Sequence, residues 1–170
     1  MNAFKKMIQD YVLRLKMNRI DNSTAFIPFD DIRNAIVFCD TSLSSEKKLI
    51  DLHNLLSSKK INCKLLMYVP SISIEDSNMN ITYVRDKDIS WKGSFIDKTV
   101  NDIYENEYDV LFDLRNSSTV LSDFLVKSLK YKFSVGIADN VKGADLVIET
   151  KGDIKKFIEL IIEYLKKLKS

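Results

Sequence analysis

The feature that most constrains the fold is the stretch at residues 107–119, where an unbroken apolar run meets a polar segment. The apolar run at 110–112 contains no polar residue, as expected for a strand that is covered on both faces of its sheet. Asp113 ends the run, and side chains able to cap a helix follow at 116–119. Apolar residues then recur at helical spacing as far as Leu129. The stretch therefore predicts a central strand that leads into a helix, the repeating half-unit of a parallel α/β sheet.

Similar apolar runs elsewhere alternate with segments of helical periodicity. Further strands are predicted at 34–39, 63–69, 81–84, 133–138 and 145–149. Helices are predicted from Glu46, over 96–104 and 117–130, and from Asp153. With right-handed crossovers, this alternation favours a three-layer Rossmann-like or flavodoxin-like α/β domain with a mostly parallel sheet, over residues 34–170. The rest of 71–106 is the segment that the pattern places least well.

A separate amphipathic helix is predicted at residues 1–20. An apolar stripe at helical spacing comprises Phe4, Ile8, Tyr11, Val12 and Leu15. Five basic residues accompany it, against one acidic residue, and give these twenty residues a net charge of +4 in a chain of net charge +2. The five are Lys5, Lys6, Arg14, Lys16 and Arg19. Two interpretations stay open: a helix packed on the domain with a solvated charged face, or a contact element for an acidic protein, a nucleic acid or a membrane surface.

Composition narrows the function classes. The chain holds four glycines in 170 residues and contains neither the GxGxxG nor the GxxxxGK[ST] pattern, so the standard dinucleotide and P-loop sites are absent and no cofactor is predicted. Cys39 and Cys63 each lie within an apolar run without metal-ligand spacing, which indicates buried, reduced thiols and a cytoplasmic protein. No run approaches the ~20 apolar residues that a transmembrane helix needs.

Two strand ends resemble each other and define a candidate ligand site. In both, a buried strand ends in an aspartate and a hydroxyl-rich helix start follows. If the strands are neighbours at a topological switch point, both loops face one crevice, where helix N-termini and an arginine could bind an anion. The candidate residues are Asp40, Thr41, Ser42, Asp113, Arg115, Asn116, Ser117 and Ser118. The alternative is that these residues simply cap helices, and the two carboxylates would repel a phosphate unless Mg²⁺ bridged them.

No catalytic residue and no metal ligand can be assigned from the sequence. His53, the single histidine, falls within the apolar stripe of a helix, which indicates a structural role. Trp91 and Phe95 flank Lys92 and could stack on a base or a sugar, although a turn anchored by a buried aromatic ring is the simpler interpretation.

Five short motifs are similar to those of an uncharacterised family of short bacterial α/β proteins, known only as a domain of unknown function. They are the basic N-terminal helix and the segments at 87–93, 108–112, 133–136 and 145–148. The resemblance covers most of the chain and implies no known activity.

A local resemblance concerns 107–118 and 133–137, which are similar to the N-terminal half of heptosyltransferase-type glycosyltransferases. The chain covers only that half and lacks the second domain that would bind a nucleotide-sugar donor. Two hypotheses follow. The first is a non-catalytic cytoplasmic interaction module that acts through its basic helix; the alternative is a binder, or an enzyme, for a sugar-phosphate or nucleotide-like anion.

Overall fold

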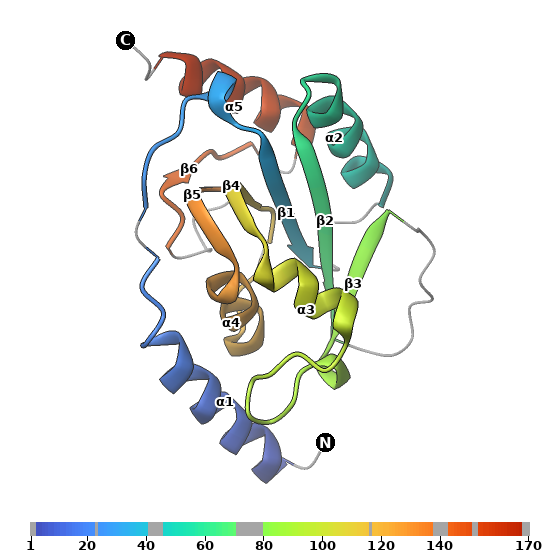
Figure 1. The fold of residues 1–170 in the computed structure, drawn as a ribbon, viewed down its shortest axis with the longest axis vertical. Coiled ribbons are helices and arrows are strands. Elements are labelled where there is room, and N and C mark those ends of the chain that lie inside the picture. The colour runs from blue at the N-terminus through green and yellow to red at the C-terminus, as the bar shows by residue number, and fades with distance from the viewer. Residues whose placement is uncertain are drawn as a thin grey trace.

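The fold is described from a computed structural model of the chain. It describes residues 3–22, 24–40, 46–70, 80–115, 117–137, 143–150 and 153–167. Within these ranges the strands form one six-stranded sheet, entirely parallel, in the order β3-β2-β1-β4-β5-β6 (Figure 1). The strands are β1 (Asn34–Asp40), β2 (Asn62–Val69), β3 (Ile81–Arg85), β4 (Glu107–Asp113), β5 (Lys130–Gly136) and β6 (Leu146–Val147).

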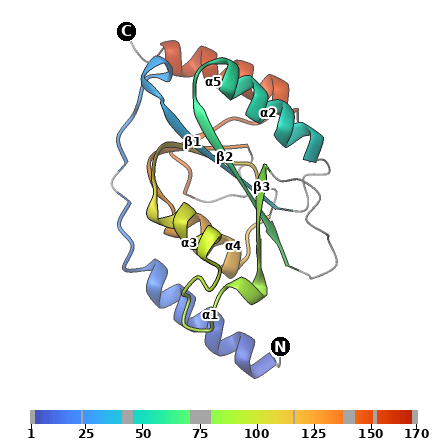
Figure 2. The ribbon, with the colours of Figure 1, turned by 45° about the vertical axis from the view of Figure 1, so that its right-hand side comes forward.

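Helices cover both faces of this sheet, so the predicted three-layer architecture is confirmed. The α-helices are α1 (Ala3–Met17), α2 (Glu46–Ser58), α3 (Lys98–Glu105), α4 (Val120–Ser128) and α5 (Ile154–Lys167), and the short 3₁₀ turns are η1 (Phe29–Asp31) and η2 (Asp86–Asp88). Buried side chains of α2 and α5 share one apolar cluster with one face of the strands. Those of α1, α3 and α4 share a second cluster with the other face (Figure 2).

The predicted central strand is the middle of the molecule. β4 lies between β1 and β5 and runs parallel to both, and its last four residues are buried. The register pairs Phe38 of β1 with Asp113 of β4, so the two aspartate-terminated strand ends are neighbours, which is the condition for the candidate ligand site. The strand order is that of Rossmann-type sheets, in which the direction of winding reverses between β1 and β4.

Element boundaries follow the local capping chemistry. The helix predicted at 117–130 begins at Val120, because Thr119 is its N-cap and its hydroxyl accepts a hydrogen bond from the Ser122 backbone N–H at 3.1 Å. The strand predicted at 145–149 is shorter and covers Leu146–Val147. α5 begins as predicted, since the Asp153 carboxylate accepts from the Lys156 N–H at 3.1 Å.

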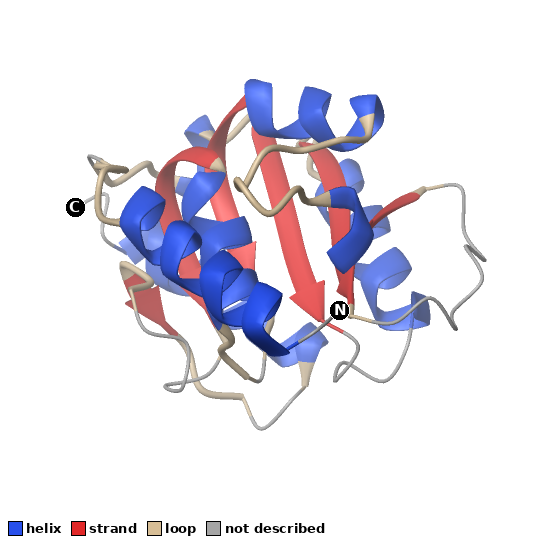
Figure 3. Ribbon diagram, turned by 90° about the horizontal axis from the view of Figure 1, so that it is seen from below, coloured by secondary structure: helices blue, strands red, loops and turns tan. Residues whose placement is uncertain are grey.

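α1 packs on the domain with most of its basic residues exposed, as one interpretation of the sequence predicts, but the predicted apolar stripe is not the face that packs. α1 forms, but Phe4, Met7 and Tyr11 are 62%, 61% and 63% exposed, whereas Leu13 is fully buried. The sheet face beneath is already covered by α3 and α4, so α1 packs as an outer helix on α4 along a narrow edge. Figure 3 shows α1, the helix that leads to the N label, in front of the strands. The apolar stripe consequently faces outward.

The predicted buried tryptophan anchor is also wrong. Trp91 is 57% exposed, and Phe95 anchors the loop instead by stacking on Tyr104 with ring centroids 3.9 Å apart. Gly93 has a φ of +70°, and a Cβ at this position would lie 2.8 Å from a methyl carbon of Leu13. Glycine is therefore required both by the turn and by the close approach of α1.

Both cysteines are buried, as predicted, and this gives stability a dependence on pH. Burial raises the pKa of the Cys63 thiol to about 12 and that of Cys39 further. Unfolded thiols titrate near pH 8.5, so the contribution of each thiol is fully present below that pH and is lost as the pH rises above it.

We expect the free energy of unfolding to fall by up to ~1.4 kcal/mol per pH unit and per thiol above about pH 8.5. Urea unfolding of the wild type and of Cys63→Ala, followed from neutral pH to about pH 10, measures this dependence. The variant should lose less stability over the alkaline range. If the free energies of unfolding of the two proteins fell equally with pH, the Cys63 thiol would not be a source of the pH dependence.

Candidate functional site

The carboxyl edge of β1 and β4 is the place where the fold brings polar side chains together. Asp40 and Asp113 end the two strands and are 7% and 2% exposed. Ser117, from the loop after β4, donates its hydroxyl to Asp40 at 3.3 Å. Thr41, Ser42 and Asn116, which the sequence assigns to the same candidate site, lie outside the described residues.

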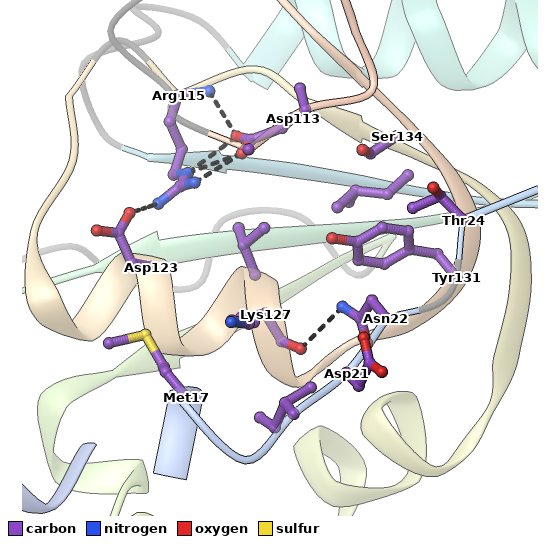
Figure 4. A pocket seen from close by; sticks show the side chains of 15 residues that line it. Met17, Asp21, Asn22, Thr24, Asp113, Arg115, Asp123, Lys127, Tyr131 and Ser134 are labelled. Carbon is purple, nitrogen blue, oxygen red and sulfur yellow. Dashed lines mark hydrogen bonds and ion pairs between the residues drawn. The ribbon is translucent and has the colours of Figure 1, made fainter. Parts of the chain in front are cut away.

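Arg115 is the centre of a buried ion-pair network at this edge (Figure 4). Its Nε and Nη2 donate to the carboxylate of Asp113 at 2.9 and 2.7 Å, a bidentate pair. Its Nη1 donates to Asp123 of α4 at 2.9 Å and to the Ser122 hydroxyl at 3.1 Å. The guanidinium is thus bonded on every nitrogen and is 1% exposed.

The single positive charge of Arg115 is paired with two carboxylates of the protein itself. Burial alone would lower the pKa of the Arg115 guanidinium, but hydrogen bonds and charge from Asp113 and Asp123 raise it above its usual value. Ser118 adds a hydroxyl donor to Asp123 at 2.6 Å. Arg115 is therefore a structural tie between the end of β4 and the first turn of α4, and each of its side-chain nitrogens donates to a group of the protein.

The predicted single crevice is divided into two pockets. The first, which we call the β5 pocket, has a volume of about 390 Å³ and lies among α4, β5 and the connector after α1 (Figure 4). Asp113 and Arg115 line it. The second, the β1 pocket, has a volume of about 450 Å³ and is lined by Asp40 and Ser117. The two strand-end aspartates thus serve different pockets.

The β5 pocket has polar walls whose groups are largely engaged with one another. Asn22 donates to the Lys127 carbonyl oxygen at 3.2 Å, and Ser134 donates to Asp145 at 2.7 Å. Burial raises the pKa of the Tyr131 hydroxyl, whose ring lines the same wall. Figure 4 shows these side chains arranged around the pocket.

The β1 pocket is acidic. Among the described residues that line it, the carboxylates come from Asp10, Asp40 and Asp86, and the basic side chain is that of Lys6. Tyr68 donates to Asp86 at 2.7 Å, and burial together with this hydrogen bond raises the pKa of the phenol. Such a lining repels phosphate. Among the described residues, no group of three or more histidine, cysteine, aspartate or glutamate side chains could hold a metal ion.

The basic residues assigned to partner binding lie on the surface of α1 and just after it. Lys5, Lys6, Arg14 and Arg19 are exposed. Lys16 is half-buried and donates its ammonium to the Gly93 carbonyl oxygen at 3.0 Å, so it holds the helix to the loop. His53, on α2, is half-buried, which agrees with a structural role.

The sequence did not predict that the apolar residues of α1 share this exposed surface. Met7, Ile8, Tyr11 and Leu15 are exposed alongside the basic residues. Their helical spacing is visible in the sequence, but periodicity shows only that they share a face and leaves open which way that face points.

These features define a Rossmann-like three-layer α/β protein with an internally paired switch point and an outward-facing amphipathic helix. The chain belongs to the family of unknown function DUF6913, whose model matches residues 5–168. The predicted membership of an uncharacterised family is thus confirmed. No curated protein matches the chain, and the local likeness to heptosyltransferases has no counterpart in these comparisons. Within the described residues, every helix is too short or too polar to cross a membrane.

Proposed function

We propose that this protein is a non-catalytic interaction module whose contact surface is the outward face of α1. The carrying observation is that Met7, Tyr11 and Leu15 are 61%, 63% and 42% exposed on a helix that is anchored by its opposite edge. A solvent-facing apolar stripe of this kind is typical of a surface that another molecule covers. Because exposed basic residues lie beside the stripe, we expect the partner to carry a negatively charged surface.

The anchoring of α1 supports a preformed surface. Leu13 is fully buried in the apolar cluster that α1 shares with α3 and α4. The Lys16 ammonium donates to the Gly93 carbonyl oxygen at 3.0 Å. The helix therefore presents its apolar stripe without having to fold on binding, which lowers the entropic cost of association.

The alternative, a pocket for a sugar-phosphate or nucleotide-like anion at the β1–β4 edge, is less well supported. Its predicted cation, Arg115, is used by Asp113 and Asp123. The neighbouring β1 pocket is lined by more acidic than basic residues. Asp40 and Ser117 remain candidate ligand-binding residues, for an uncharged hydroxylated molecule in preference to an anion.

The interaction proposal is tested by the triple variant Met7→Ser/Tyr11→Ser/Leu15→Ser. We expect its thermal unfolding midpoint to stay close to that of the wild type, because the three side chains are exposed and surface substitutions usually change stability by no more than ~0.5 kcal/mol each. In gradient sedimentation of a crude extract, the wild-type chain should migrate with a larger assembly or a membrane fraction. The variant should migrate as the free 19.6 kDa chain.

Tyr164→Ser is the matched control, since Tyr164 is an exposed aromatic residue of α5 at 49% exposure, and it should sediment as the wild type does. A wild-type chain that already sediments as a free monomer in the extract would contradict the proposal.

A further inference from the structure

We propose that the outward face of α1, together with the adjacent loop at residues 90–96, binds the surface of a membrane that contains anionic lipids. This inference rests on the interaction function proposed above and names its partner. The surface, which we call the α1 face, comprises Met7, Ile8, Tyr11, Leu15, Trp91 and the basic residues Lys5, Arg14, Arg19 and Lys92.

The apolar part of the α1 face has the composition of an interfacial helix. Amphipathic helices of low net hydrophobicity lie in the membrane plane with their apolar side chains buried at the boundary between headgroups and acyl chains. Met7, Tyr11 and Leu15 lie one helical turn apart and are all exposed. α1 is 15 residues long and carries both apolar and basic side chains, so it suits a helix that lies on a bilayer and cannot cross one.

The charge of the α1 face matches an anionic headgroup layer. Lys5, Arg14 and Arg19 are exposed, and Asp10 is the single acidic residue of the first twenty. Long basic side chains at the border of an apolar stripe can reach headgroup phosphates while their alkyl stems lie along the apolar surface. The net charge of +4 over these residues supplies the attraction to anionic lipid.

The loop at 90–96 lies beside α1 and carries an exposed tryptophan. The bond from the Lys16 ammonium to the Gly93 carbonyl oxygen, at 3.0 Å, holds the loop beside α1, as Figures 1 and 2 both show. Trp91 is 57% exposed, and the Lys92 ammonium lies 5.2 Å from its ring centroid. Tryptophan favours the membrane–water interface because its large ring is apolar and its N–H is polar.

Two other partners fit the α1 face less well. Nucleic acids are bound mainly through phosphate contacts, which would leave the stripe of Met7, Tyr11 and Leu15 exposed. In a symmetric dimer the same patch meets itself, so the basic residues of one copy would face a patch that is also basic. An anionic bilayer satisfies both the apolar and the basic side chains at once.

The test uses Trp91 as an intrinsic probe, because it is the single tryptophan of the chain. The full-length protein is mixed with vesicles of phosphatidylcholine alone or of phosphatidylcholine with phosphatidylglycerol, and both tryptophan emission and flotation of the protein are measured. We expect a blue shift and flotation with the mixed vesicles, roughly tenfold weaker binding to the neutral ones, and loss of binding at high salt.

Variants assign the binding to the α1 face. Both Met7→Ser/Tyr11→Ser/Leu15→Ser and Lys5→Glu/Arg14→Glu should lose flotation. The matched charge control is Lys155→Glu/Lys166→Glu, which reverses two exposed lysines of α5 and should float as the wild type does. Equal loss in the α5 control would show non-specific charge attraction and overturn the proposal.

The outcomes separate the lipid from the interaction function. Suppose that neither flotation nor tryptophan emission shows binding of the protein to vesicles, while its sedimentation in the extract still depends on Met7, Tyr11 and Leu15. The lipid proposal then falls, and the interaction function stands with a protein partner. If light scattering shows a dimer that the triple variant abolishes, the partner is a second copy and the lipid proposal falls. If vesicles and extract are both negative, both proposals fall.

Discussion

Replacing Arg115 by methionine should lower the free energy of unfolding by about 3–5 kcal/mol. The guanidinium is 1% exposed and makes a bidentate bond to Asp113, which is 2% exposed. The methionine side chain fills similar space but leaves the Asp113 carboxylate buried without its counter-charge. Urea unfolding followed by circular dichroism measures the change.

Two variants make this result specific to the buried pair. Arg14→Met removes an exposed arginine and should change stability by no more than ~0.5 kcal/mol. Asp113→Leu/Arg115→Met removes both buried charges and should recover much of the lost stability, because apolar replacement of a whole buried pair is often neutral. If Arg115→Met alone were as stable as the wild type, Arg115 would not be the tie between β4 and α4.

Leu13→Ala should cost about 2–5 kcal/mol, because Leu13 is fully buried and its removal leaves a cavity beneath α1. The matched variant Leu15→Ala changes the same residue type in the same helix, where the side chain is 42% exposed. It should change stability by only ~0.5 kcal/mol, since leucine and alanine have similar helix propensities.

The comparison of the two leucine variants is measured by urea unfolding under one set of conditions. A larger loss for Leu15→Ala than for Leu13→Ala would mean that α1 docks through its apolar stripe. The account of an outward-facing α1 face would then be wrong.

The architecture could be predicted because the strands are marked by local patterns. The apolar run at 110–112 and the one that ends at Cys39 are each followed by an aspartate and a helix cap, and these signals depend only on neighbouring residues. Their parallel direction follows from the alternation of strands and helices, whereas their adjacency in the sheet is a finding of the structure. The pattern places the segment around β3 least well, because that strand is short and the connection from β2 is long.

The role of Arg115 could not be predicted, because it depends on how the chain bends after β4. The sequence suggests a cation available to an anion, whereas the bend turns the guanidinium back on Asp113 and toward Asp123 on α4. Arg115 lies two positions along the chain from its first partner and eight positions from its second. Helix capping, the alternative role for the hydroxyl-rich segment after β4, is the role that Thr119 has at the start of α4.

The orientation of α1 depends on what the rest of the sheet leaves uncovered. An apolar stripe predicts burial only where an apolar surface is available, and here α3 and α4 already cover that face. α1 is held instead by Leu13 and Lys16, whose positions in the sequence give no sign of that role. Because α3 and α4 already cover the sheet, the side chains of Tyr11 and Leu15 stay exposed.

The outward direction of the apolar stripe is tested most directly by thiol labelling of Leu15→Cys and Gln9→Cys under native conditions. The native thiols of Cys39 and Cys63 are buried and should stay unlabelled until the chain unfolds. Position 15 is 42% exposed and position 9 is 5% exposed, so the thiol of Leu15→Cys should react at once and that of Gln9→Cys only after denaturation. Fast labelling of Gln9→Cys with a protected thiol at position 15 would contradict the account.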